Sequence, residues 1–321
     1  MKLRIVSVSR RTDIPAFYGE WFMNRIRAGW CAVPNPFNTN QVSRVEFNPK
    51  DTVIVFWTRW AAPFLKHIDE LDQLGYRFYF QYTLVNYPKM LDPKSPSLDK
   101  AITVFRRLAE RIGPEKVIWR YDPILFSQGT DTDFHLENFA NIAERLSGAT
   151  KHVVISTVDP YDKATNRLTR LGKEHSDFQF RLFDESTDGF IFEKLANIAN
   201  TYGMEIKSCA EEIDLRPFGI EPGKCIDDKL IELLFGLDVN HKKDKGQRKA
   251  CDCVESREIG MYDSCLFGCS YCYATKSFTT ADKNHSTHNP QSESLIGNYT
   301  APPSKNKPEQ DDQEQYELPG L

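Results

Sequence analysis

Short apolar runs rich in β-branched and aromatic residues recur along the first two thirds of the chain, separated by stretches whose apolar positions keep helical spacing. Most of the runs are apolar at consecutive positions and do not alternate, which is typical of parallel strands buried on both faces. The pattern predicts six strands, in residues 3–9, 52–58, 77–84, 116–122, 152–159 and 204–209.

The stretches between these runs are predicted to be helices. Leu98, Ile102 and Phe105, for example, fall on one helical face, and Gly113 stands where a helix C-cap is expected. Repeated strand–helix units predict an α/β fold, which is either a barrel, complete or partial, or an open doubly wound sheet.

The ends of the predicted strands favour the barrel. Nearly every strand ends in polar or charged residues. Barrel enzymes collect their functional groups from many strand ends, whereas an open sheet concentrates them at one switch point. The G-x-G-x-x-G of a dinucleotide fold does not follow the first strand. We therefore expect a partial or complete (β/α) TIM-like barrel.

Composition divides the chain into three regions. Residues 1–237 carry the strand–helix units and are expected to form the barrel, with residues 31–49 as a loop or small hairpin over one rim. Residues 238–282 hold five of the eight cysteines and are expected to form a cluster-binding segment packed on the barrel. Residues 283–321 are polar and proline-bearing, so they are expected to be a flexible tail or a strap over the barrel.

The overall charge narrows the classes of partner. A net charge of −4 over 321 residues argues against binding of polyanions by the whole surface. The locally basic run HKKDKGQRK at 241–249 is either a solvated loop or a contact to phosphate or nucleic acid. No secretory signal and no apolar run of ~18 residues is apparent, so we expect a cytoplasmic protein with no membrane partner. In that reducing compartment, clustered thiols are more often metal ligands or redox groups than disulfides.

Polar residues at the strand ends are the candidate catalytic groups. They are Arg10, Arg11, Asp13, Arg59, Arg120 and Asp122. The arginines either bind a carboxylate or phosphate or are solvated. Asp13 is a helix cap in the plainer interpretation, and Asp122 either pairs with Arg120 or accepts a proton. Glu211, after the sixth strand, is a candidate for holding a cofactor amine or ribose.

The sequence CLFGCSYC carries the most specific chemistry. Cys265, Cys269 and Cys272 form a C-x3-C-x2-C array, which can ligate three irons of a [4Fe-4S] cluster and leave the fourth without a protein ligand. Simple electron carriers take four cysteines for such a cluster, whereas an open iron can bind a substrate or cofactor.

These cysteines also suit other uses. Zinc could be held by Cys251, Cys253 and two of the later three cysteines, because tetrahedral zinc also favours closely spaced thiols. A thioredoxin-like use of CSYC is less favoured, since that motif belongs at the start of a helix after an early strand. A c-type haem requires CxxCH, but Tyr273 stands where the histidine is needed.

A second group of thiols can be separated from the first. Cys209, Cys225, Cys251 and Cys253 make four, the number that a closed iron–sulfur cluster or a zinc ion requires. The plainer interpretation of Cys209 is a small buried hydrophobe. Cys31 has no evident partner and is expected to be structural.

The C-x3-C-x2-C array resembles the motif of radical S-adenosylmethionine enzymes, whose open iron chelates the amino and carboxyl groups of that cofactor. The resemblance makes Cys265, Cys269 and Cys272 the cluster ligands, and it puts Tyr271 at the aromatic position that packs near the adenine. In that family the motif follows the first strand, whereas here it follows the sixth. The family's Gly-Gly-Glu type segment after the second strand, which holds the cofactor's amino group, is missing from VIVFWTRWAAPF.

From Ser9 to about Gly297, the chain resembles the bacterial family catalogued as domain of unknown function 1848. The matching segments include SRRTDIPAFYGEWF, VFWTRWAAPFL, VIWRYDPIL, CAEEIDL and CDCVESREIGMYDSCLFGCSYCYA. The resemblance implies a barrel-like core with a C-terminal iron–sulfur motif and implies no particular reaction.

Two functional hypotheses follow. The first is a radical S-adenosylmethionine-like enzyme with a [4Fe-4S] cluster at the barrel mouth, an electron donor such as a flavodoxin or ferredoxin, and a small-molecule or nucleic-acid substrate. The second is a non-radical protein that binds zinc or a closed iron–sulfur cluster for structure or sensing, with a rim that binds an anion or nucleic acid.

Overall fold

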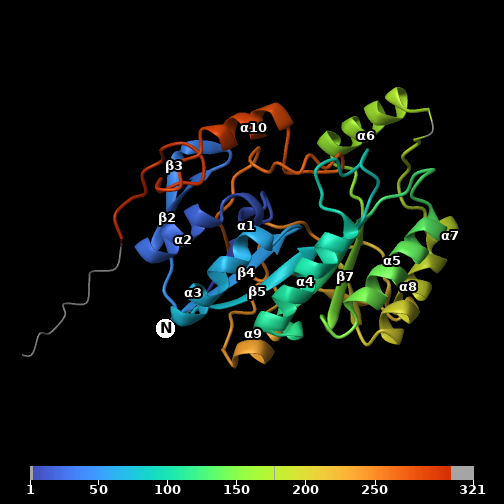
Figure 1. The fold of residues 1–321 in the computed structure, drawn as a ribbon, viewed down its shortest axis with the longest axis horizontal. Helices are drawn as coiled ribbons and strands as arrows, with labels where there is room; N and C mark the ends of the chain where they lie inside the picture. The colour runs from blue at the N-terminus through green and yellow to red at the C-terminus, as the bar shows by residue number, and fades with distance from the viewer. Residues whose placement is uncertain (1–2, 177, 305–321) are drawn as a thin grey trace, which may run out of the picture.

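The computed structural model describes residues 3–176 and 178–304, and its centre is one parallel sheet of eight strands (Figure 1). The strand order is β10-β1-β4-β5-β6-β7-β8-β9. These strands are β1 (Arg4–Val8), β4 (Thr52–Thr58), β5 (Arg77–Thr83), β6 (Val117–Ile124), β7 (His152–Thr157), β8 (Glu205–Cys209), β9 (Glu221–Gly223) and β10 (Arg257–Glu258).

All six predicted strands are confirmed, and so is the α/β class. From β1 to β9 the strands of this sheet lie side by side in chain order, without the order reversal of a doubly wound sheet. Among the described residues no pairing joins β9 to β10, so the sheet is open there and a closed TIM barrel is not established.

Helices cover one face of the sheet, where most of the aromatic core lies. The ring of Trp119 on β6 stacks on Phe139 of α5 with centroids 4.6 Å apart, and α4, α5 and α8 run along this face in Figure 1. The α-helices are α1 (Ile14–Phe17), α2 (Gly19–Ala28), α3 (Ile68–Gln73), α4 (Leu98–Ile112), α5 (Thr132–Leu146), α6 (Asp162–Glu174), α7 (Glu185–Asp188), α8 (Phe190–Thr201), α9 (Asp228–Phe235) and α10 (Phe278–Ser286). Three short 3-10 helices are η1 (Ala62–His67), η2 (Pro114–Lys116) and η3 (Arg216–Phe218).

A second, smaller core lies on the other face of the sheet. Val53, Val55 and Tyr79 of the strands pack there against residues 225–254, which include α9. Cys225, Cys251 and Cys253 belong to this core. The segment 238–282, expected to lie on the barrel, contributes Val239, Cys251, Cys253 and Val254 to this core and Phe267, Cys269 and Tyr271 to the larger one. It also adds the edge strand β10 to the sheet.

Two further segments lie beside the sheet. The expected hairpin is formed by β2 (Trp30–Asn35) and β3 (Asn38–Glu46), which pair antiparallel. The chain after α10, called the strap below, packs on the protein as far as the described residues extend: Trp21 donates to the carbonyl of Ser292, and Leu295 is 1% exposed. The expected tail beyond Ser304 lies outside the described residues. None of the described helices combines the length and apolar character needed to span a membrane.

Candidate metal and ligand site

A cavity of about 460 Å³ opens at the carboxyl ends of the strands. Its wall includes Trp57 of β4, Arg120 of β6 and Ser156 of β7. The carboxyl ends of the strands are where the functional groups of a barrel-like enzyme are expected. Seven of the eight cysteines also line it: Cys209, Cys225, Cys251, Cys253, Cys265, Cys269 and Cys272. The cavity therefore brings together the thiols of both predicted groups.

Strand β10 brings the C-x3-C-x2-C loop to this cavity. Its Glu258 accepts hydrogen bonds from the Ser7 hydroxyl at 3.0 Å and from the backbone N–H groups of Arg10 at 2.9 Å and Gly260 at 2.8 Å. Gly260 passes so close to Ser9 that a Cβ atom would collide with that side chain. The cysteine loop thus starts directly beside the end of β1.

A buried group of three side chains fixes the middle of the loop. Arg59 donates to the Cys269 sulfur at 3.3 Å, to the Tyr271 hydroxyl at 2.6 Å and to Asp92 at 2.5 Å. The Tyr271 hydroxyl also lies 2.8 Å from both oxygens of Asp92, which is 1% exposed. Tyr271 lines the cavity, but its hydroxyl is committed to this group. Nothing in the sequence had singled out Asp92.

Arg167 of α6 holds the end of the same loop. Its guanidinium donates to the backbone carbonyls of Ser270 at 3.0 Å, Thr275 at 2.8 Å and Cys272. Because Arg167 binds only backbone carbonyls, it occupies none of the loop's thiols, which line the cavity. Arg167 was also missed by the sequence analysis, because it lies in an ordinary polar helix.

Burial governs the protonation of these thiols. It raises the pKa of Cys265 to about 12 and raises the pKa of Cys269 well above its usual value, although Arg59 opposes the shift at Cys269. The raised pKa values favour the neutral thiols of Cys265 and Cys269 when no metal is bound. A metal ion or cluster would have to displace their protons, so binding is expected to release protons.

Asp13 has the capping role of the plainer interpretation. Its carboxylate accepts from the backbone N–H of Ala16 at 2.9 Å, the Thr58 hydroxyl at 2.9 Å and the backbone N–H of Arg59 at 2.6 Å. Burial raises the pKa of Asp13 to about 7. These contacts tie the first turn of α1 to the end of β4.

Arg120 and Asp122 form the expected ion pair. Asp122 also accepts a hydrogen bond from Ser156, and Arg120 donates to the Cys225 sulfur at 2.9 Å. Both residues line the cavity. Arg120 therefore contacts both the carboxylate of Asp122 and the sulfur of Cys225.

The two remaining rim arginines differ from each other. Arg11 donates to the carbonyl of Gly260 at 3.4 Å and lies over the ring of Tyr262, 4.8 Å from its centroid. Arg10 lies over the ring of Trp57 at 5.5 Å, and its Nη2 atom is buried with no hydrogen-bond partner. A buried, unpaired guanidinium nitrogen is rare because its desolvation is unfavourable, and it marks Arg10 as a candidate ligand-binding group.

Glu211, a candidate cofactor-binding residue, is directed elsewhere. Its carboxylate accepts from the backbone N–H of Thr157 at 2.7 Å and from the Thr157 hydroxyl at 2.9 Å, and it is not part of the cavity wall. Burial raises its pKa to about 7. In this structure Glu211 links the ends of β7 and β8.

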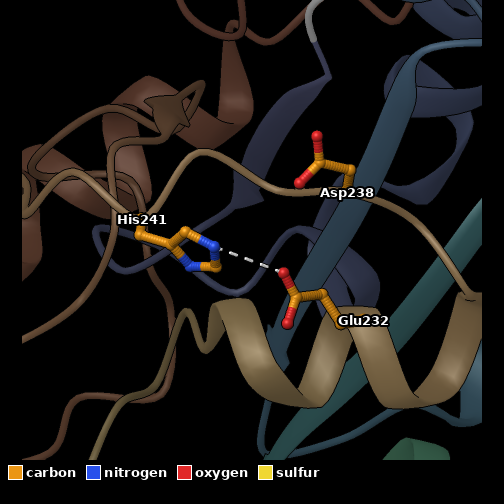
Figure 2. A group of neighbouring side chains, drawn as sticks. All are labelled: Glu232, Asp238 and His241. Atoms are coloured by element: carbon orange, nitrogen blue, oxygen red, sulfur yellow. Dashed lines mark ion pairs between the residues drawn. The ribbon is translucent and has the colours of Figure 1, made fainter.

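A separate group of possible metal ligands lies on α9 and the chain after it. Figure 2 shows Glu232, Asp238 and His241, whose ligand atoms lie within 4.8 Å of one another. His241 already pairs with Asp228 at 2.6 Å and with Glu232 at 3.5 Å, and Asp228 raises its pKa. Asp238 and His241 are exposed, and the ion pairs account for the arrangement without a metal.

The family model described as "Domain of unknown function (DUF1848)" matches residues 5–274. No curated protein matches the chain. The matched range begins within β1, continues through β10 and includes all three cysteines of the C-x3-C-x2-C array.

Proposed function

The chain belongs to the DUF1848 family, whose description names no activity, and we propose that it is an iron–sulfur enzyme of the radical S-adenosylmethionine type. Cys265, Cys269 and Cys272 would hold a [4Fe-4S] cluster at the mouth of a partial (β/α) barrel. The substrate would occupy the rest of the cavity.

The pairing of β10 with β1 carries the proposal. In radical S-adenosylmethionine enzymes the cysteine motif follows the first strand of the sheet. In this chain the motif follows the sixth of the strands predicted from the sequence. Because β10 is the edge strand next to β1, the cysteine loop here also leaves the edge strand of a parallel sheet. If β10 corresponds to that family's first strand, β1 corresponds to its second strand. The position of the Gly-Gly-Glu segment then falls after β1, where this chain has Arg10 and Arg11.

The residues present suit the cluster. Thiolates are the ligands that iron–sulfur clusters use, and the three thiols line a cavity while Asp92 and Arg167 hold the loop from outside it and Arg59 holds it from the cavity wall. When bound, such a cluster supplies an electron and one iron open to the amino and carboxyl groups of S-adenosylmethionine.

Each charged neighbour has a role that follows from its contacts. The hydrogen bond from Arg59 to the Cys269 sulfur stabilises negative charge on that ligand, which is one of the ways in which proteins tune cluster potentials. The unpaired Nη2 of Arg10 offers a charge-assisted hydrogen bond to a carboxylate or phosphate in the cavity. The proposal therefore assigns Arg10 to an anionic group of the cofactor or substrate.

Anaerobic purification and reconstitution test the proposal. The protein should bind iron and sulfide, and it should form 5′-deoxyadenosine from S-adenosylmethionine when dithionite, or a flavodoxin or ferredoxin, supplies electrons. The Cys269→Ala variant should lose that iron and the activity. The matched variant Cys31→Ala removes a buried thiol of the hairpin that does not line the cavity, and it should keep both.

Two results would contradict the proposal. Zinc without iron or sulfide would favour the other hypothesis, a structural or sensing metal protein whose rim binds an anion or nucleic acid. Iron and sulfide without detectable binding of S-adenosylmethionine would leave a redox or sensing role.

A further inference from the structure

Four thiols outside the C-x3-C-x2-C array come from three separate parts of the chain. Cys209 ends β8, Cys225 follows β9, and Cys251 with Cys253 precedes β10. All four line the same cavity, and three of them belong to the core on the face that α9 covers. Their meeting is a property of the fold, since no short sequence motif unites them. Below they are called the thiol quartet.

The sulfurs of the thiol quartet contact one another in a chain. Those of Cys209 and Cys225 are 2.8 Å apart, and the Cys253 thiol lies near enough to those of Cys225 and Cys251 to interact with both. A disulfide would bring two sulfurs to about 2.05 Å and join them in pairs. Tetrahedral zinc, with bonds of about 2.3 Å, holds four sulfurs roughly 4 Å apart. The four sulfurs form a chain of neighbours and not a tetrahedron, because no three of these described thiols lie within 4.8 Å of one another, and a bound metal ion or cluster would draw them together.

The sheet itself holds the quartet in place. The carbonyl of Cys225 accepts hydrogen bonds from the Tyr79 hydroxyl at 2.9 Å and from the Gln81 side chain at 2.8 Å, both on β5. The backbone N–H of Ile226 in turn donates to the Cys253 sulfur at 3.4 Å. These contacts fix two of the four ligands before any metal binds.

Two guanidinium groups complement the charge of the site. Arg120 donates to the Cys225 sulfur at 2.9 Å, and Arg10 lies close enough to Cys253 to interact with it electrostatically. Four thiolates around zinc or around a [4Fe-4S] core leave an excess of negative charge. Arg120 also pairs with Asp122, but its contact to the Cys225 sulfur, together with Arg10, puts positive charge where metal-bound thiolates would carry negative charge.

Little regular secondary structure and little apolar packing stabilise the segment between α9 and β10. No helix or strand lies between α9 and β10, a segment that the structure describes in full. Few of its residues are buried apolar side chains besides Val239 and Val254. Metal binding at such a place contributes directly to folding free energy, as in small metal-stabilised domains.

We propose that Cys209, Cys225, Cys251 and Cys253 form a second, closed metal centre, with zinc or an iron–sulfur cluster bound by all four thiolates, which fixes the segment before β10 to the sheet. The centre does not depend on the function proposed for Cys265, Cys269 and Cys272. It leaves no ligand position open to substrate.

Metal analysis of single Cys→Ser variants of the full chain, purified without oxygen, tests the proposal. Each of the four quartet variants should lose the same metal, either one zinc per chain or the iron and sulfide of one cluster. Each should keep the metal held by Cys265, Cys269 and Cys272. The Cys269→Ser variant should show the reverse loss, and Cys31→Ser should lose neither.

A second measurement covers variants that fail to fold. Chelation of the wild-type protein should release the quartet metal together with a fall in the melting temperature, and restoring that metal should reverse it. Cys251→His should retain the metal if it is zinc, because imidazole is also a zinc ligand, and should lose it if it is an iron–sulfur cluster bound by four thiolates.

Three outcomes would overturn the second centre. One is an unchanged metal content in the Cys209→Ser and Cys225→Ser variants. Another is loss of the same metal from Cys251→Ser, Cys253→Ser and Cys269→Ser, which would mean one shared site. The third is a Cys209–Cys225 disulfide in the protein purified without oxygen. Absence of iron at Cys265, Cys269 and Cys272 would contradict only the function proposed above.

Discussion

The carboxylate of Asp92 is almost completely buried, and its two oxygens are the partners of the Arg59 guanidinium and the Tyr271 hydroxyl. The variant Asp92→Asn removes the negative charge and leaves the Arg59 charge buried without compensation. We expect the free energy of unfolding to fall by about 3–5 kcal/mol, as when one partner of a buried ion pair is lost. Urea unfolding of the metal-free protein measures this change.

The exposed ion pair between Lys94 and Asp282 supplies the control. Asp282→Asn should change the free energy of unfolding by less than about 1 kcal/mol, because solvent screens such pairs. If Asp92→Asn is no more destabilising than Asp282→Asn, the buried pair does not hold the cysteine loop.

His135 makes stability depend on pH. Its ring is buried, in contact with the Tyr121 hydroxyl at 2.9 Å and the carbonyl of Leu125 at 3.0 Å. Burial lowers its pKa to about 4, whereas an unfolded chain has a histidine pKa of about 6.5. Because the unfolded state takes up the proton first, the contribution of neutral His135 is fully present above about pH 6.5 and is lost as the pH falls towards 4.

The size of this effect follows from the two pKa values. The free energy of unfolding should fall by about 3 kcal/mol between pH 6.5 and pH 4 from this residue alone. Other groups also titrate there, so the measured quantity is the difference between wild type and His135→Gln at each pH. A difference that stays constant over this range would show that His135 is not a buried neutral group.

Residues differ in how far the sequence reveals their roles. Cys265, Cys269 and Cys272 were found because their spacing is itself the signal. Asp92 and Glu258 are single acidic residues in polar stretches, and their partners lie 33 and 248 positions away, at Arg59 and Arg10. Only the fold brings such pairs together, so no local pattern marks them.

Secondary-structure elements can be predicted only where they are long enough to show a sequence pattern. The six long strands were predicted because five or more consecutive positions carry a pattern. β9 has three residues and β10 has two, too few for any period to show. β10 nevertheless decides where the cysteine loop lies, so the relation of the loop to β1 could not be predicted.

The strap after α10 is an element whose contribution to stability can be measured. Leu295, at 1% exposure, is its buried anchor. Leu295→Ala should lower the free energy of unfolding by about 2–5 kcal/mol, since a buried leucine leaves a cavity when truncated. Leu233→Ala on α9, where the leucine is 78% exposed, should stay within about 0.5 kcal/mol in the same denaturation experiment. Equal effects would mean that the strap only rests on the surface.

At the scale of the whole molecule, the cavity combines thiols with an unpaired guanidinium nitrogen. Arg10→Gln should weaken binding of S-adenosylmethionine to the reconstituted protein by about tenfold or more, the loss expected for one charge-assisted hydrogen bond. Isothermal titration measures the affinity, and iron analysis should show unchanged metal content. A lower melting temperature with unchanged affinity would make Arg10 structural.

The hydrogen bond between Ser7 and Glu258 joins residues 251 positions apart, and this has a consequence for synthesis on the ribosome. At about 5–20 residues per second, β1 is translated many seconds before its edge partner β10 exists. During that time the N-terminal strand has one unpaired edge, and the cysteine loop cannot reach its place beside Ser9. The cavity is therefore completed only when almost the entire matched domain has emerged, and the metal binding proposed above would be a late event in the life of each new chain.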